Sequence, residues 1–107
     1  MAFYIKQNDT SPAMQATLKD ASDAAIDLTN CSVRFHMRQI GATATKVDAA
    51  ASIIDDDNGI VKYSWDAADT DTVGSFEAEF EVTFADGSIE TFPNNRFIQV
   101  EITDDIA

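Results

Sequence analysis

The chain has 107 residues, 45% of them hydrophobic, and its 19 acidic and 7 basic residues give a net charge of −12 at pH 7. This length predicts one domain, residues 1–107, with a core over about 3–103. So acidic a chain repels phosphate backbones and anionic lipids, which argues against nucleic-acid and membrane partners. The single cysteine, Cys31, excludes an internal disulfide, and neither a secretory signal nor an apolar run of membrane length is present. We expect a soluble protein made in a reducing cytoplasm.

Apolar and polar residues alternate with a period of two along most of the chain, and turn residues recur about every 8 to 12 positions. This pattern predicts short β-strands. In chain order they are expected at 3–6, from Pro12 onward, at 32–40, 47–54, 60–66, 75–84 and 88–92, and from Ile98 to Ile102. Alanines in 47–54 could favour a helix, but its β-branched residues and the turn that follows favour a strand. The polar crossover 67–75 has room for one helical turn.

Seven to eight short antiparallel strands in about 100 residues predict an all-β fold, an immunoglobulin-like antiparallel β-sandwich of two sheets. Asn58-Gly59 is the preferred dipeptide of a type I′ turn, so it should join 47–54 and 60–66 as a hairpin. Cys31 is expected to be a small core filler. The other side chains expected inside alternate along the strands: Val33, Phe35, Met37, Val61, Tyr63, Trp65, Phe76, Ala78, Phe80, Val82, Ile98, Val100 and Ile102.

The outward side chains of 32–40 are cationic or histidine, whereas those of 75–84 are acidic. The two sets are Arg34, His36 and Arg38, and Glu77, Glu79 and Glu81. In immunoglobulin-like connectivity these two strands are neighbours, so we expect a cross-strand charge ladder between them. Each facing pair of opposite charges contributes about 0.2–1 kcal/mol. The hypothesis fails if the two strands lie in different sheets.

None of the polar clusters has the pattern of a catalytic site. The three glutamates lie about 7 Å apart along an open strand face, where nothing raises the pKa of one carboxyl as glycoside hydrolysis requires. His36 lacks a nucleophile and an orienting acid, and one histidine with one cysteine cannot complete a zinc site. The oxygen-rich loops 55–59 and 66–71 lack the spaced pattern of a calcium loop, although calcium binding there stays open. We expect no enzyme activity, no cofactor and no bound metal.

Several motifs, in their order and spacing, resemble a known family. The opening "IKQNDTSPAMQATLKD", the strand "DLTNCSVRFHMR" and the later "WDAADTDTVGSFEAEFEVTFADGSIETFPNN" are similar to the N-terminal domain of phage baseplate upper proteins, and the resemblance runs from Phe3 to about Ile102. It implies a non-enzymatic structural protein of a tailed-phage virion, assembled in the host cytoplasm. Its partners would be other phage structural proteins, and it would form a homo-oligomer or occur in multiple copies. Because the chain ends soon after the domain, a small accessory or decoration protein of the tail, neck or head fits as well.

Edge strands and loops are the expected contact surfaces, since an edge strand can add to the sheet of a partner through main-chain hydrogen bonds. The candidate contact residues lie in the first strand, the loop "DAADTDT" and the C-terminal tail: Phe3, Tyr4, Ile5, Asp69, Asp71, Asp104, Asp105 and Ile106. The alternative is a module that binds carbohydrate or the host surface, which predicts that Trp65 or Tyr63 is exposed as a stacking platform. A small hydrolase, which needs two carboxyls in one pocket, fits least.

Overall fold

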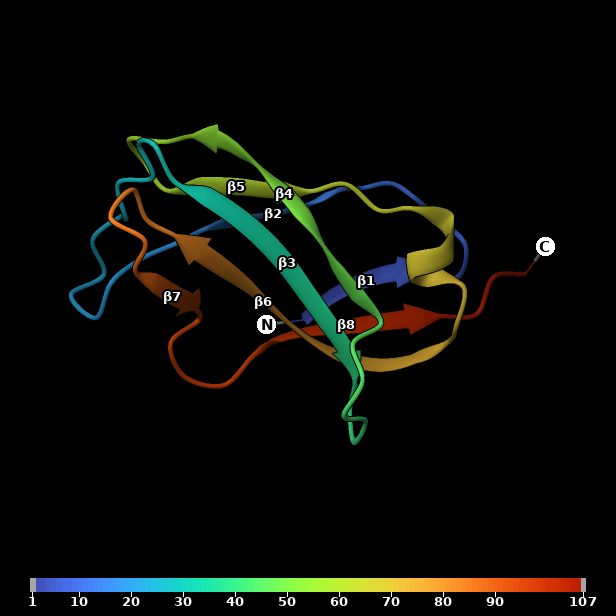
Figure 1. Cartoon of the computed structure of the whole chain (residues 1–107). Helices are drawn as coiled ribbons and strands as arrows, with labels where there is room; N and C mark the ends of the chain where they lie inside the picture. The colour runs from blue at the N-terminus through green and yellow to red at the C-terminus, as the bar shows by residue number, and fades with distance from the viewer. Residues whose placement is uncertain (1, 107) are drawn as a thin grey trace.

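The computed structural model describes residues 2–106, so the two ends of the predicted domain, Met1 and Ala107, lie outside the described residues. Over these residues the fold consists of eight strands and one short 3-10 helix (Figure 1). The strands are β1 Ala2–Lys6, β2 Met14–Thr17, β3 Ser32–Gln39, β4 Val47–Asp55, β5 Ile60–Tyr63, β6 Gly74–Thr83, β7 Ile89–Phe92 and β8 Ile98–Thr103, and the helix η1 is Ala67–Thr70. The all-β class is confirmed. Over the described residues, no helix is long and apolar enough to cross a membrane.

The strands follow one continuous path, in the order β1-β8-β6-β3-β4-β5-β2, with β7 paired to β6 beside β8. Strand β4 joins the two layers, because its first half, 47–51, pairs with β3 and its second half, 52–55, pairs with β5. The two expected layers are therefore halves of one bent sheet. All strand pairs are antiparallel except β1 and β8, which run parallel. This pair corrects the expectation of a wholly antiparallel sandwich.

The core lies between the two layers and is built by the alternation that the sequence predicts. The inward residues of β6 are Phe76, Ala78, Phe80 and Val82, and none is more than 1% exposed. Phe35 occupies the centre: its ring stacks on Tyr63 with centroids 4.4 Å apart and meets the edge of Trp65 at 5.6 Å. Offset and edge-to-face aromatic contacts of this kind add stabilisation beyond the burial of apolar area. Most of the predicted core residues are buried, while Cys31 and Ile98 are partly exposed at its border.

The hairpin between β4 and β5 forms as predicted, but its turn differs from the expected type. Asp55 pairs with Ile60, so the loop has four residues, 56–59. A type I′ turn needs a positive φ at both central residues, whereas only Gly59 of the Asn-Gly pair has one, at +66°. The Gly59 carbonyl accepts a hydrogen bond of 2.8 Å from the Leu18 amide, which ties the hairpin to the segment after β2. Tertiary contact, and not the dipeptide alone, sets this turn.

Candidate interaction surfaces

The outer face of β3 and β6 carries the residues of the predicted ladder. The two strands are neighbours, and their register places Arg34 opposite Glu81, His36 opposite Glu79, and Arg38 opposite Glu77. Two of these rungs make contacts. The Arg38 Nε donates to Glu77 Oε1 at 2.8 Å, and the His36 Nδ1 lies 3.2 Å from Glu79 Oε2.

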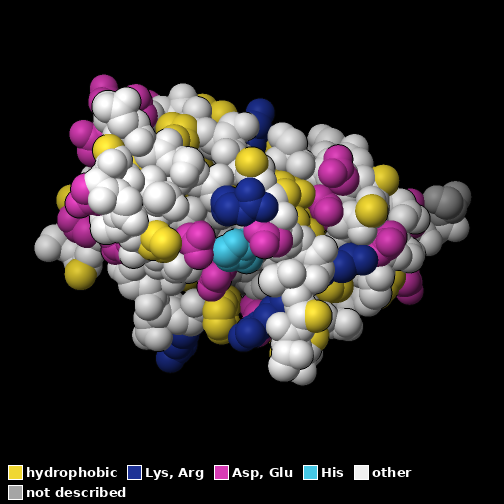
Figure 2. Space-filling view, in the orientation of Figure 1, with side chains coloured by type: hydrophobic (Ala, Val, Ile, Leu, Met, Phe, Trp, Pro, Cys, Tyr) yellow, Lys and Arg dark blue, Asp and Glu magenta, His cyan; other side chains and the backbone are white. Residues whose placement is uncertain are grey.

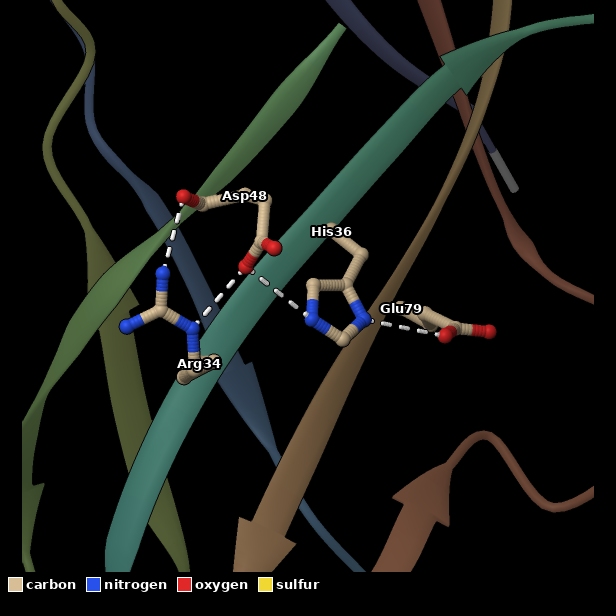
Figure 3. Close-up of polar contacts among 4 residues, drawn as sticks. All are labelled: Arg34, His36, Asp48 and Glu79. Atoms are coloured by element: carbon tan, nitrogen blue, oxygen red, sulfur yellow. Dashed lines mark hydrogen bonds and ion pairs between the residues drawn. The ribbon is translucent and has the colours of Figure 1, made fainter. Parts of the chain in front are cut away.

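Arg34 turns the other way, to the strand on the opposite side of β3 (Figure 3). Its Nε donates to Asp48 Oδ1 and its Nη2 to the Asp48 carbonyl, both at 2.9 Å. Strand β4 brings Asp48 into reach because its register sets Asp48 opposite His36. Asp48 therefore also lies 3.3 Å from the His36 Nε2. The predicted ladder becomes a network across three strands, with Asp48 as an additional member.

His36 bridges two carboxylates with its two ring nitrogens. Its side chain is only 20% exposed, and Asp48 and Glu79 face it from β4 and β6 (Figure 3). Both ring nitrogens thus lie within 3.3 Å of a carboxylate oxygen, and the ring is held in place as part of a structural network. No nucleophilic side chain takes part in these contacts.

The pKa of Asp48 gives this network a pH dependence. The hydrogen bond from Arg34 lowers the pKa of Asp48 below its ordinary value of 3.8. A carboxyl with a depressed pKa in the folded state stabilises the fold above its unfolded pKa, and this contribution is lost as pH falls through the folded value. We expect Asp48→Asn to lower the melting temperature at pH 6 and to match the wild type near about pH 2. A deficit of equal size at both pH values, measured by thermal melts, would contradict this assignment.

The face beside this network is hollowed, in contrast to the open strand face expected from the sequence. The hollow measures about 180 Å³, and its lining comes from β3, the β3–β4 loop, β6 and the residue before β8: His36, Met37, Arg38, Thr43, Thr45, Glu77, Glu79 and Phe97. The Arg38 guanidinium carbon lies 5.2 Å from the centre of the Phe97 ring, and that residue is 44% exposed. Figure 2 shows the histidine with basic and acidic side chains gathered around it on this face.

A second surface forms where β1 ends. Strand β1 lies at one end of the sheet path, and within residues 2–106 it pairs with β8 alone. Its side chains divide as the pleat requires. Ile5 is buried and Phe3 packs inward against the Trp65 ring, with centroids 5.8 Å apart, whereas Tyr4 points outward and is 67% exposed.

The three segments that contain the candidate contact residues meet at this end of the molecule (Figure 1). The Gln7 side chain donates to the Asp71 carbonyl at 2.8 Å, and the Asn8 amide donates to the Thr70 carbonyl at 2.9 Å. The Lys6 Nζ donates to the Asp104 carbonyl at 3.2 Å, which holds the tail beside β1. We name as the β1 end the exposed residues of β1, of the segment after η1 and of the tail: Tyr4, Asp71, Asp104, Asp105 and Ile106.

Comparison with known proteins assigns the chain to a family. The sequence model of the BppU N-terminal domain, the N-terminal domain of baseplate upper proteins, matches residues 3–106. The chain belongs to this family. Membership in the BppU N-terminal domain family makes it a structural protein of the phage baseplate, located in the virion. No curated protein matches the chain.

Among solved structures, the crystal structure of CopC from Methylosinus trichosporium OB3b is similar to this BppU N-terminal domain. The TM-score is 0.55 at 11% sequence identity, over 99% of this chain and 87% of that chain. At this identity the likeness shows a shared β-fold alone, and function has to be argued from the sites.

The aromatic residues and loop aspartates that were candidates for sugar or metal binding have structural roles in this BppU N-terminal domain. Tyr63 and Trp65 are both 4% exposed, so neither forms a surface for stacking sugars. The Tyr63 hydroxyl donates to Asp69 Oδ2 at 2.5 Å, and burial together with this contact raises the pKa of Tyr63. Asp69 thus anchors η1 to the core, while Asp71 forms an ion pair with Lys46. Between residues 2 and 106, no group of three or more His, Cys, Asp or Glu side chains is placed to hold a metal ion.

Proposed function

We propose that this domain is a non-enzymatic module that makes protein–protein contacts within the baseplate, in several copies, through its β1 end. The observation that carries the proposal is the convergence of three distant parts of the chain, residues 6–8, residues 70–71 and Asp104, on one end of the molecule. Main-chain and side-chain hydrogen bonds hold them together there. Such a surface is preorganised, so binding costs little additional ordering of loops.

The chemistry of the β1 end suits a protein partner. An end strand has a row of main-chain N–H and C=O groups that a strand of a neighbouring protein can pair with. Tyr4 adds a large aromatic side chain that is 67% exposed, and tyrosine is enriched among the residues that dominate interface energies. Ile106 is fully exposed and adds apolar surface beside two aspartates. The mixture of one aromatic anchor, an apolar tip and acidic groups is typical of an interface with a polar rim.

The proposal predicts that Tyr4→Glu lowers the number of copies of this protein in purified phage particles by about tenfold or more. A charge at this position would be desolvated against the partner, whereas in the free domain it faces water and leaves folding intact. The measurement is quantitative mass spectrometry of purified particles, with circular dichroism of the isolated variant as a test of folding.

Ile89→Glu is the matched control, because Ile89 is 61% exposed on β7, a strand outside the β1 end. We expect this variant to be incorporated at the wild-type level. Equal incorporation of the Tyr4 and Ile89 variants would remove the β1 end as the contact surface.

A further inference from the structure

We propose that the hollow beside the charge network receives a cationic side chain, arginine or lysine, from a neighbouring baseplate protein. This inference rests on the proposed role of the domain in protein–protein contacts, and it adds a second contact surface with a defined partner chemistry. The hollow is built by Glu77 and Glu79 of β6, the β3–β4 loop residues Thr43 and Thr45, and Phe97 before β8.

The carboxylates of Glu77 and Glu79 are held in place by neighbouring side chains, but each uses only one of its two oxygens in these contacts. Glu77 accepts from Arg38 through Oε1, and Glu79 faces His36 through Oε2, so each contact engages one oxygen of its carboxylate. The side chains of Glu77 and Glu79 are only 20% and 30% exposed. Half-buried carboxylates fixed by their neighbours can accept charge-assisted hydrogen bonds without first losing rotamer freedom. The second oxygen of each carboxylate is the acceptor that we assign to the incoming cation.

The rest of the lining suits the same ligand. The Phe97 ring lines the hollow and is 44% exposed, and the Arg38 guanidinium carbon 5.2 Å from its centroid shows that this ring can take part in a cation–π contact. The Arg38 charge is matched by Glu77 at 2.8 Å, which limits its repulsion of a second cation. Thr43 and Thr45, which carry hydroxyl groups, also line the hollow. Carboxylates, an aromatic face and hydroxyls together favour a guanidinium or an ammonium group.

The charge of the chain also indicates whether the partner at the hollow is a different protein or a second copy of this chain. The chain carries −12, so two copies repel one another at long range, whereas a basic partner surface is attracted. The outer face of β3, β4 and β6 has more acidic than basic side chains. The acidic ones are Glu77, Glu79, Glu81 and Asp48, the basic ones are Arg34 and Arg38, and His36 lies among them. The acidic excess remains even with His36 charged. The occupant is therefore a basic side chain on a protein of different composition.

Nuclear magnetic resonance titration tests the proposal with a defined probe. Uniformly ¹⁵N-labelled protein is titrated with the capped peptide acetyl-Gly-Arg-Gly-amide, and with the same peptide carrying neutral citrulline. We expect saturating shifts at the amides of Thr43, Thr45 and Phe97 with the arginine peptide, and at least about fivefold weaker binding of the citrulline peptide.

Variants separate the hollow from general attraction to an acidic protein. The double substitution Glu77→Gln and Glu79→Gln should weaken binding of the arginine peptide about fivefold to tenfold. Phe97→Ala should also weaken it. Glu81→Gln is the control for position, because it removes one carboxylate charge from the same face of β6 but Glu81 does not line the hollow. The ¹⁵N spectrum of each variant reports whether it is folded.

The outcomes distinguish this inference from the proposed function. Shifts that are the same with citrulline, that spread over the aspartate-rich loops, or that persist in the double variant would overturn the hollow as a site. This conclusion would hold whatever the incorporation of the Tyr4 variant. Arginine-dependent shifts at the hollow, lost in the double variant and kept in Glu81→Gln, would support the site even if the Tyr4 variant is incorporated normally.

Discussion

Replacing Phe35 with alanine is expected to lower the free energy of unfolding by about 3–5 kcal/mol. The ring is fully buried and contacts Tyr63, Trp65 and Phe80 with centroids 4.4, 5.6 and 5.2 Å away. Its removal deletes apolar burial and leaves a cavity between the two layers. A domain of this size has a total stability of about 5–15 kcal/mol, so the loss is a large part of the whole. Urea unfolding followed by tryptophan fluorescence measures it.

Phe97→Ala serves as the control for Phe35, because it removes the same ring from a position that is 44% exposed. We expect a loss below about 1 kcal/mol there, since little buried surface is removed. If the two variants had equal midpoints of unfolding, Phe35 would not be the centre of the core.

Gly59→Ala is expected to cost about 3 kcal/mol or more, although it adds a single methyl group. Gly59 has φ of +66°, which disfavours any residue with a Cβ. A Cβ at this position would also lie 2.7 Å from the Leu18 carbonyl oxygen and 2.8 Å from that of Ile26. Both are main-chain atoms, so relief requires the hairpin and the segment after β2 to separate. Equilibrium unfolding gives the size of the effect.

Gly87→Ala isolates the conformational part of this cost. Gly87 has φ of +88°, but a Cβ there meets no atom within 4 Å. We expect a loss of about 1–2 kcal/mol from the left-handed backbone alone. If the two glycine variants lost the same stability, the short distances from a Cβ at Gly59 to the Leu18 and Ile26 carbonyl oxygens would not contribute to the cost.

Most of the strands could be predicted because each is determined by the alternation of apolar and polar residues within its own segment. Alternation along β3 and β6 alone identifies which side chains are buried, and it also places Arg38 and Glu77 on the same outer face. The pairing of these strands followed from the connectivity of a sandwich. The partner of Arg34 did not follow, because β3 has a neighbour on each side and β4 presents Asp48 closer to Arg34 than β6 presents Glu81.

The features that sequence reasoning missed depend on residues far apart in the chain. The parallel pairing of β1 with β8 joins Ile5 to Ile102, and no local pattern specifies its direction. The turn at Gly59 depends on the carbonyls of Leu18 and Ile26, which a dipeptide rule cannot include. The hollow depends on the β3–β4 loop and on Phe97. The exposed aromatic before β8 was the one available signal, and its position over Arg38 required the register of β8 on β6.

The contact role of the β1 end is tested most directly by a cryo-electron-microscopy map of the intact virion in which this chain is located. We predict several copies of the domain in the baseplate, each with density of a neighbouring protein against Tyr4 and the tail at 104–106. Copies whose β1 end faces solvent on all sides, with the neighbouring proteins contacting other faces, would contradict the proposed function.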